Sequence, residues 1–268
     1  MENLLVHKNS GADLLVKVKN IVIGGEEKVI ISGPCSVEDY DNMYAIAKDL
    51  KRIGVHMLRA GAFKPRTSPY DFQGLKEEGL KILKSVGNEF GMPIVTEVMD
   101  SKDIDLVVNY ADMLQIGSRN MYNYSLLKEV GKLKTPILLK RGMSATLSEW
   151  LYAAEYIMSS GNENVVLCER GIRTFETFTR NTLDLSSVVA IKQSYRIPII
   201  VDPSHGTGKR ELVDRMSLAS IAAGADGLMI ESHICPDNAL SDSRQTVSMD
   251  TVNDIVKNVK RFEGMFRS

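Results

Sequence analysis

Three cationic side chains stand close together in the segment from Leu58 to Pro69, where an apolar stretch gives way to a loop. They are Arg59, Lys64 and Arg66, and Pro65 removes a backbone donor and stiffens the turn between the last two. Arginine presents a planar fork to phosphate or carboxylate, whereas lysine presents a compact point charge. The segment therefore predicts an anion-binding site, with a solvated basic loop as the alternative.

A second group of reactive side chains offers ligands for a metal ion. Cys35, His205, Glu231 and Asp242 supply a thiolate, an imidazole and two carboxylates. No short ligand spacing joins them, but a fold that brought them together would form a mixed-ligand site for a divalent cation. Oxygen ligands suit Mn²⁺, whereas cysteine and histidine favour Fe²⁺, Co²⁺ or Zn²⁺, so the choice of metal stays open.

The elements that must position these groups alternate along the chain. Short β-branched runs recur with amphipathic stretches between them, each long enough for a parallel crossover. The predicted strands are Val29 to Ser32, Val55 to Arg59, Pro93 to Glu97, Ala111 to Ile116, Pro136 to Lys140, Asn164 to Cys168, Ile197 to Val201 and Ala225 to Ile230. The amphipathic stretches include Asp39 to Ile53, Gly74 to Phe90, Thr146 to Ser159, Leu212 to Ala223 and Met249 to Phe262.

About eight strand-helix units in roughly 240 residues match a TIM (β/α)8 barrel in number and size. The early Gly-rich fingerprint that a doubly wound sheet would often carry is missing. Before the barrel, Leu14 to Val18 and Ile21 to Ile23 read as a β-hairpin, which we expect at the closed bottom. We therefore expect an α/β fold with a hairpin extension over residues 1–27 and one catalytic barrel over residues 28–268.

Active sites of TIM barrels lie at the C-terminal ends of the strands, and the reactive residues of this chain fall there. In strand order they are Cys35, then Arg59, Lys64 and Arg66, then Glu97, Arg119, Lys140, Arg170, His205, and finally Glu231 with Asp242 in the loop beyond it. Any one of them alone could be structural. Their joint location predicts one site with far more positive charge than one monoanion requires. Two phosphorylated substrates, one also bearing a carboxylate, would account for the excess.

Composition narrows the other possibilities. The chain has 268 residues, of which 44% are hydrophobic and 25% charged, and this suffices for a full core. A net charge of -1 gives no global attraction to nucleic acid or to an anionic membrane. No apolar run approaches the roughly 20 residues of a membrane span, and the N-terminus lacks a signal-peptide layout. Three widely spaced cysteines make a poor disulfide framework, so we expect a cytoplasmic protein.

Together the motifs resemble the type I 3-deoxy-D-arabino-heptulosonate 7-phosphate (DAHP) synthases, which open the shikimate pathway to chorismate and the aromatic amino acids. The resemblance runs in order from about Lys28 to the C-terminus. It rests on Gly33-Pro34-Cys35-Ser36, Lys64-Pro65-Arg66-Thr67-Ser68, Ile116-Gly117-Ser118-Arg119-Asn120, Leu139-Lys140-Arg141-Gly142, Glu169-Arg170-Gly171, Asp202-Pro203-Ser204-His205 and Ala239-Leu240-Ser241-Asp242.

The chain is similar to the subclass that includes 3-deoxy-D-manno-octulosonate 8-phosphate (KDO8P) synthase. That enzyme usually has an Asn-Arg-Ser-Ser type sequence where this chain has Lys64 to Ser68. The difference favours erythrose 4-phosphate over arabinose 5-phosphate as the aldehyde substrate. KDO8P synthase activity remains the first alternative.

The resemblance also implies a role for each residue. Phosphoenolpyruvate would be held by Arg59, Lys64, Arg119, Lys140 and Arg170, and the phosphate of erythrose 4-phosphate by Arg66, Thr67 and Ser68. A divalent metal on Cys35, His205, Glu231 and Asp242 would polarise the aldehyde, and Glu97 and Lys140 are the candidates for proton transfer.

The family is commonly oligomeric, often tetrameric, so a homo-oligomer is expected. The residues before the barrel are too few for a regulatory domain or a fused chorismate mutase, and we expect no feedback inhibition through a fused domain. Two further hypotheses stay open. One is a class I aldolase in which Lys140 forms a Schiff base. The other is a sugar-phosphate sensor without enzymatic activity, which would need the cations but not the metal ligands.

Overall fold

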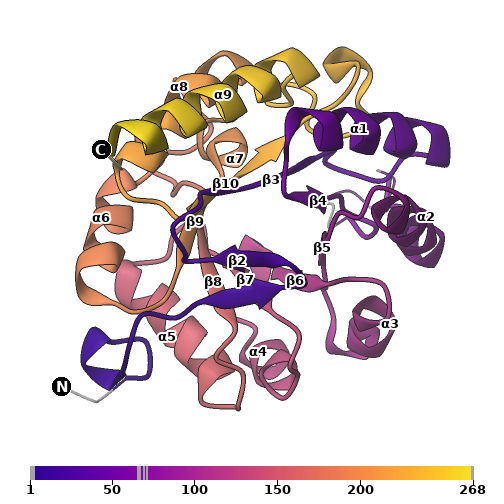
Figure 1. The fold of residues 1–268 in the computed structure, drawn as a ribbon. Coiled ribbons are helices and arrows are strands. Elements are labelled where there is room, and N and C mark those ends of the chain that lie inside the picture. Colours follow the sequence, from indigo (N-terminus) through magenta and orange to yellow (C-terminus); the bar gives the residue numbers. More distant parts are fainter. Residues whose placement is uncertain (1–3, 65–67, 69, 71, 267–268) are drawn as a thin grey trace.

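A closed barrel of parallel strands forms the centre of the protein in this computed structural model, which describes residues 4–64, 68, 70 and 72–266 (Figure 1). The strands are β3 (Val29–Gly33), β4 (Met57–Arg59), β5 (Ile94–Glu97), β6 (Met113–Ile116), β7 (Ile137–Lys140), β8 (Val165–Glu169), β9 (Ile199–Val201) and β10 (Gly227–Glu231). Each pairs with the next in the sequence, and β10 pairs with β3 to close the ring. The predicted TIM barrel is confirmed, with strand ends within two residues of those expected.

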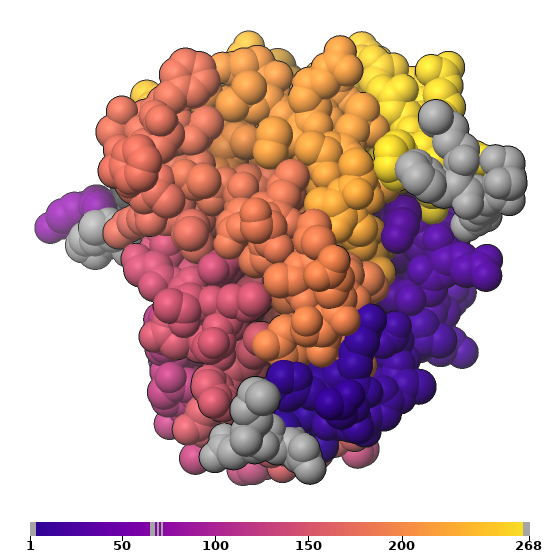
Figure 2. Space-filling view, turned by 90° about the vertical axis from the view of Figure 1, so that its left-hand side faces the viewer, coloured from indigo at the N-terminus to yellow at the C-terminus, as the bar shows by residue number. Residues whose placement is uncertain are grey.

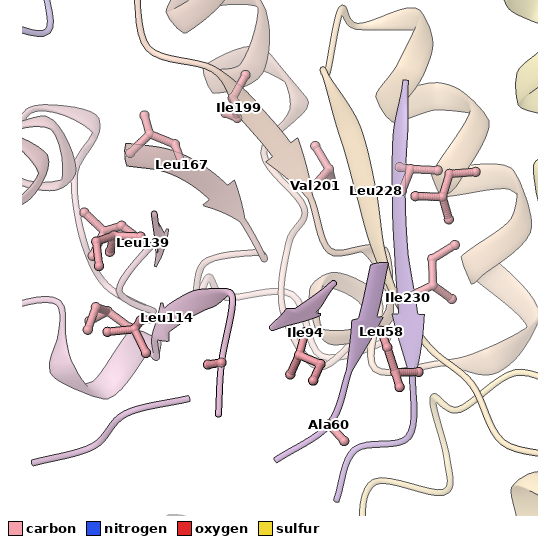
Figure 3. Close-up of a cluster of buried hydrophobic side chains, with 14 of the residues drawn as sticks. Leu58, Ala60, Ile94, Leu114, Leu139, Leu167, Ile199, Val201, Leu228 and Ile230 are labelled. Atoms are coloured by element: carbon pink, nitrogen blue, oxygen red, sulfur yellow. The ribbon is translucent and has the colours of Figure 1, made fainter. Parts of the chain in front are cut away.

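Side chains of every strand alternate between the barrel interior and the surrounding helices, because successive residues of a strand point to opposite faces. The inner cluster contains Val29, Ile31, Met57, Val95, Met113, Leu138, Val166, Cys168, Ile200 and Met229. The outer cluster takes the residues beside them, among them Leu58, Ile94, Leu114, Leu139, Leu167 and Leu228 (Figure 3). The alternation fixes which residues can enter a cavity at the strand ends.

The helices surround the barrel (Figure 1). They are α1 (Tyr40–Ile53), α2 (Lys76–Glu89), α3 (Ile104–Val108), α4 (Tyr124–Gly131), α5 (Leu147–Met158), α6 (Leu185–Ser194), α7 (Pro203–Thr207), α8 (Arg210–Ala222) and α9 (Met249–Phe266), with 3₁₀ turns η1 (Lys8–Ser10), η2 (Ser101–Asp103), η3 (Ser118–Asn120) and η4 (Pro236–Asn238). The five amphipathic stretches that the sequence indicates correspond to α1, α2, α5, α8 and α9. The other four have at most 10 residues, too few turns for a clear 3.6-residue pattern.

Local sequence explains where the predicted helices begin. The side chain of Asp39 accepts a hydrogen bond from the backbone N–H of Asn42 and caps α1. At the start of α5, Thr146 and Glu149 form a reciprocal capping box. Trp150 of this helix is completely buried and donates from its indole N–H to the carbonyl of Leu139. The helix is thereby anchored to β7, which carries Lys140 into the site.

A two-stranded antiparallel hairpin covers the end of the barrel at which the strands begin. It consists of β1 (Val16–Val18) and β2 (Ile21–Ile23), drawn in indigo across the barrel in Figure 1. Val16, Val18 and Ile23 are buried in the inner cluster. The predicted N-terminal hairpin and its place at the bottom of the barrel are therefore confirmed.

The segment that leads to the hairpin packs along the barrel wall. His7 pairs with Tyr195, and the backbone of Arg196 bonds to that of Val6 and Leu14. In the space-filling view the indigo N-terminal segment accordingly lies against the orange part of the chain (Figure 2). Among the residues that the structure describes, no helix is long and apolar enough to cross a membrane.

Candidate active site

A cavity of about 120 Å³ opens at the C-terminal ends of the strands. It is lined by Arg59, Lys64, Glu97, Gln115, Gly117, Ser118, Arg119, Lys140, Met143, Arg170, Arg180, His205 and Asp242. Five of these cations are the ones expected to hold phosphoenolpyruvate. The structure therefore brings Arg59, Lys64, Arg119, Lys140 and Arg170 together around one space.

The strand alternation explains why these side chains reach the cavity. Arg59 lies two residues beyond Met57, whose side chain points into the barrel, so it points inward as well. Lys140 follows Leu138 in the same way, and Arg170 follows Cys168. The cations therefore form the layer immediately above the apolar interior of the barrel.

The predicted metal ligands gather beside this cavity. Cys35, Glu231 and Asp242 each offer a ligand atom, and these three atoms lie within 4.8 Å of one another. His205 joins them through Glu231, with its Nε2 3.5 Å from the carboxylate Oε1. Thus three of the four predicted ligands form a compact group, and the fourth lies next to one of its carboxylates.

The three clustered ligands differ in whether their side chains are ionised in the metal-free protein. Burial, together with the charge of Glu231, raises the pKa of the Cys35 thiol to about 12. Burial opposes ionisation of Asp242 too, but His205, the hydrogen bond from Cys35 and the charge of Lys64 outweigh it and lower that pKa to about 2. The pKa of Glu231 is likewise lowered despite its burial, chiefly by His205 and Arg59. Two ionised carboxylates thus face a protonated thiol.

This donor set fits a divalent cation. A thiol, two carboxylates and an imidazole nitrogen are all common metal ligands, and their mixture suits a metal of intermediate softness. A cation would offset the charge of the two neighbouring carboxylates and would displace the proton of Cys35. The fit rests on these residues and does not select one metal.

We call Cys35, Glu231, Asp242 and the adjacent His205 the metal group. Two of the predicted substrate cations also contact it. Lys64 Nζ lies 2.8 Å from Cys35 Sγ and donates to the Cys35 carbonyl at 3.0 Å. Arg59 donates from Nη1 to Glu231 Oε1 at 2.9 Å and to the carbonyl of Pro34. The anion-binding segment and the metal ligands therefore form one continuous site.

Lys140 meets the metal group through a residue that the sequence analysis did not select. Its Nζ donates to Asp202 Oδ2 at 2.6 Å, and the same oxygen lies 2.7 Å from Nδ1 of His205. Asp202 is fully buried, and the charges of His205 and Lys140 overcome that burial to hold its pKa well below the usual range. The carboxylate is therefore ionised between its two partners.

Glu97 lies on the wall of the cavity next to β6. Its Oε2 accepts a hydrogen bond from Gln115 Nε2 at 3.2 Å. A Cβ atom at Gly117 would collide with Oε1 of Glu97, so the absence of a side chain at position 117 makes room for the carboxylate. The placement is compatible with the predicted role of Glu97 in proton transfer.

The segment expected to hold the second phosphate is only partly described. Arg66 and Thr67 lie outside the described residues. Ser68 is described, and its Oγ accepts a hydrogen bond from the backbone N–H of Tyr70 at 3.2 Å. Ser68 is not among the residues that line the cavity.

The sequence analysis assigned no role to several polar residues of the site, among them the four residues Asp202, Gln115, Gln245 and Arg180. Gln245 Nε2 donates to Glu231 Oε2 at 2.7 Å, and Arg180 donates to Gln245 Oε1 at 3.3 Å. The sequence contains a pattern that could have identified two of these four residues. Asp202 and Gln115 lie two residues beyond the inward-facing Ile200 and Met113, so strand alternation alone places them in the cationic layer.

Comparison with known proteins gives a family match over most of the chain. The family model described as the DAHP synthetase I family matches residues 7–265. The phospho-2-dehydro-3-deoxyheptonate aldolase of Thermotoga maritima is 47% identical over 249 residues, which is 93% of this chain and 74% of the relative. A 2-dehydro-3-deoxyphosphooctonate aldolase of Syntrophotalea carbinolica is 29% identical over 272 residues, covering 94% of this chain and 97% of the relative.

Solved structures agree with this match. The crystal structure of the DAHP synthase of Thermotoga maritima superimposes with a TM-score of 0.96 at 44% identity, over 99% of this chain and 78% of that one. A truncated form of the 3-deoxy-D-arabino-heptulosonate 7-phosphate synthase of the same organism gives 0.91 at 41% identity, over 98% and 97% of the two chains.

Proposed function

The chain belongs to the DAHP synthetase I family, and from this premise we propose that it condenses phosphoenolpyruvate with D-erythrose 4-phosphate and releases inorganic phosphate. The product is 3-deoxy-D-arabino-heptulosonate 7-phosphate, and the reaction opens the shikimate pathway. The observation that carries the proposal is the single cavity in which five cations adjoin the group of Cys35, Glu231 and Asp242.

Phosphoenolpyruvate carries a phosphate and a carboxylate, and the cationic layer matches both. Arg119 and Arg170 line the cavity with Lys140 and oppose these charges from three different strand ends. Arg59 and Lys64 complete the set from the side of the metal group. Binding by several strand ends holds C3 of the enol in one orientation toward the aldehyde.

The aldehyde substrate is assigned to the segment Lys64 to Ser68. Its phosphate would bind Arg66, Thr67 and Ser68, a guanidinium and two hydroxyls that suit a phosphate monoester. Lys64 connects this segment to Cys35, so the aldehyde carbon would lie between the bound phosphoenolpyruvate and the metal group.

A divalent metal held by Cys35, His205, Glu231 and Asp242 would polarise the aldehyde as a Lewis acid. Mn²⁺, Fe²⁺, Co²⁺ and Zn²⁺ are all compatible with these ligands. The chain's own residues supply the rest of the site. Gln245 fixes one oxygen of Glu231, and Arg59 fixes the other.

The bond changes follow from the two substrates. C3 of phosphoenolpyruvate attacks the aldehyde carbon, the aldehyde oxygen takes a proton, and water adds at C2. The C–O bond to phosphate then breaks, leaving a ketone at C2 and inorganic phosphate. Glu97 and Lys140, which both line the cavity, are assigned to accept and deliver these protons.

The KDO8P synthase alternative is disfavoured by the comparisons. The heptulosonate enzyme of Thermotoga maritima is 47% identical to the chain, whereas the octulosonate enzymes reach 27–29%. The Schiff-base alternative is disfavoured by the surroundings of Lys140. Its Nζ donates to the buried carboxylate of Asp202 at 2.6 Å, so this hydrogen bond engages the atom that would have to attack a carbonyl.

Release of phosphate from phosphoenolpyruvate, with each aldehyde in turn and with or without chelator, tests the function. We expect turnover with erythrose 4-phosphate, little with arabinose 5-phosphate, and none after chelation until a divalent metal is returned. Preference for arabinose 5-phosphate would reverse the substrate assignment. Full activity in chelator, with Lys140 trapped by borohydride, would support the Schiff-base aldolase, and phosphate-sugar binding without turnover would support the sensor.

We propose further that the protein works in the cytoplasm as a homo-oligomer, a tetramer by likeness to the family. Its partners are the two small phosphorylated substrates, and neither nucleic acid nor a membrane is among them. The net charge of -1 supports this, since the positive charge of the site is local. Light scattering of the purified protein measures the number of subunits.

A further inference from the structure

Asp202 occupies a junction between two parts of the site. It follows β9 directly and caps α7, where its Oδ1 accepts the backbone N–H of His205 at 2.9 Å. Pro203 begins the helix and fixes the backbone there. The side chain of Asp202 is completely buried, so its contacts are not shared with bulk solvent.

The other carboxylate oxygen serves two donors at once. Oδ2 lies 2.6 Å from Lys140 Nζ and 2.7 Å from His205 Nδ1. Lys140 belongs to the cationic layer assigned to phosphoenolpyruvate, and His205 belongs to the metal group. One atom therefore joins the substrate side of the cavity to the metal side.

This contact sets the tautomer of His205. An ionised carboxylate only accepts hydrogen bonds, so Nδ1 must carry the proton that points to Asp202. In the neutral ring the lone pair is then on Nε2, the nitrogen that lies 3.5 Å from Glu231 Oε1. The imidazole is thus held with its free nitrogen toward the metal ligands.

We propose that Asp202 is a positioning residue that couples metal binding to phosphoenolpyruvate binding, through the single oxygen Oδ2 shared by His205 and Lys140. The inference rests on the proposed function, because it takes His205 as a metal ligand and Lys140 as a substrate ligand. A metal bound to His205 would draw electron density from the ring and would strengthen the hydrogen bond that Nδ1–H donates to Oδ2. Oδ2 would then hold Lys140 less tightly, and the ammonium would become more available to the substrate anion.

Asp202→Asn tests the proposal because it preserves the cap of α7 but replaces the acceptor Oδ2, which His205 and Lys140 share, by a donor. The amide oxygen can still accept from the backbone of His205, whereas the NH₂ group now faces two donors. His205 must then accept at Nδ1 and carry its proton on Nε2, which removes the lone pair from the metal side. Lys140 loses its anchor in the same step.

Mn²⁺ affinity, followed by electron paramagnetic resonance, and phosphoenolpyruvate affinity, followed by calorimetry, are the two readouts. We expect Asp202→Asn to weaken Mn²⁺ binding by roughly 10- to 100-fold. Phosphoenolpyruvate binding to the metal-free protein should tighten by about tenfold, because Lys140 is released from its charged hydrogen bond to Asp202 and can contact the substrate anion. Unchanged values for either ligand would overturn the coupling.

Asp226→Asn is the matched control. Asp226 is also a buried aspartate with two partners, since it accepts from Lys192 Nζ and from the backbone N–H of Ile199. It directly precedes β10, at the opposite end of the barrel. The variant should lower thermal stability while leaving both affinities within about twofold, which a general effect of removing a buried charge would not do.

A spectroscopic readout does not depend on turnover. The chain has four histidines, so the ring nitrogens can be resolved by NMR after ¹⁵N-histidine labelling. We expect the neutral ring of His205 to be in the Nδ1–H form in the metal-free wild type and in the Nε2–H form in Asp202→Asn. The Nε2–H form in the wild type would overturn the proposal outright.

Lys140→Met keeps the proposal testable if Asp202→Asn does not fold. Removing the second donor should shorten the His205–Asp202 hydrogen bond and shift the Nδ1–H proton downfield. Arg119→Met removes another cation of the cavity that has no bond to Asp202, and should leave that resonance in place. Equal shifts in both variants would contradict a specific link.

Failure of the proposed function gives a different pattern. If His205 is not a metal ligand, wild type and His205→Ala bind Mn²⁺ equally. If the inference alone is wrong, His205→Ala weakens Mn²⁺ binding whereas Asp202→Asn leaves the Mn²⁺ affinity unchanged.

Discussion

Arg59 Nη1 lies 2.9 Å from Glu231 Oε1, and the two side chains are only 6% and 0% exposed. The pair joins the second strand of the barrel to the last. Its guanidinium compensates a carboxylate that has no access to solvent, and it adjoins the metal group on one side and the substrate cavity on the other.

Replacing Arg59 by Met should leave the Glu231 carboxylate buried without its cation. We expect a loss of about 3–5 kcal/mol in the unfolding free energy of the metal-free protein. Mn²⁺ should restore part of it, because the metal offsets the same charge. Urea unfolding with and without Mn²⁺ measures both effects. Arg52→Met, which breaks an exposed pair with Asp49, should cost about 0–1 kcal/mol.

Metal binding should release a proton from Cys35. The pKa of about 12 means that the thiol is protonated at neutral pH in the metal-free protein, whereas a thiolate is the ligand. Affinity for Zn²⁺ should therefore rise with pH, by about tenfold per unit below that pKa. Calorimetry in two buffers of different ionisation enthalpy counts the protons. Tight Zn²⁺ binding to the wild type without proton release would remove Cys35 from the ligand set, and Cys35→Ser should bind weakly.

Gly117→Ala should act on catalysis through Glu97. The added methyl group would collide with Glu97 Oε1, so the carboxylate must turn away and lose its bond to Gln115. We expect kcat to fall by about 100-fold, the lower range for a lost proton-transfer group, with Mn²⁺ affinity unchanged. Glu97→Gln should show a similar loss. Gly264→Ala, whose Cβ meets nothing within 4 Å, is the control.

Ile23→Ala should lower the free energy of unfolding by weakening the packing of the hairpin against the bottom of the barrel. Ile23 is fully buried in the inner cluster, and its truncation should cost about 2–5 kcal/mol. Thermal or urea unfolding gives the loss, and Mn²⁺ affinity at 25 °C should stay the same because the site is at the other end. Val22, 40% exposed on the same strand, provides Val22→Ala as the control. An equal loss in both variants would mean that the hairpin does not pack into the barrel.

Most of the fold could be predicted because its signals are local. The β-branched runs are short, separated by amphipathic helices, and bounded by caps such as Asp39 and Thr146. The short helix α7 could not be predicted in this way, because its five residues hold no periodic pattern. Its start is set by the side chain of Asp202 and by Pro203.

The site was predictable as a set of strand-end residues but not as a set of contacts. Sequence position places Lys140 and His205 at one rim, whereas the carboxylate between them is visible only in three dimensions. Lys64 illustrates the same limit. Its proximity to Arg66 indicates an anion site, but its contact with the Cys35 sulfur depends on how two loops meet.

The hairpin at the bottom of the barrel has a kinetic consequence. Val16, Val18 and Ile23 fill the end where the strands begin, so in the part of the chain that the structure describes the cavity opens at the C-terminal ends of the strands. We therefore expect two substrates that share this entrance to bind in sequence, with the more deeply bound one binding first and leaving last.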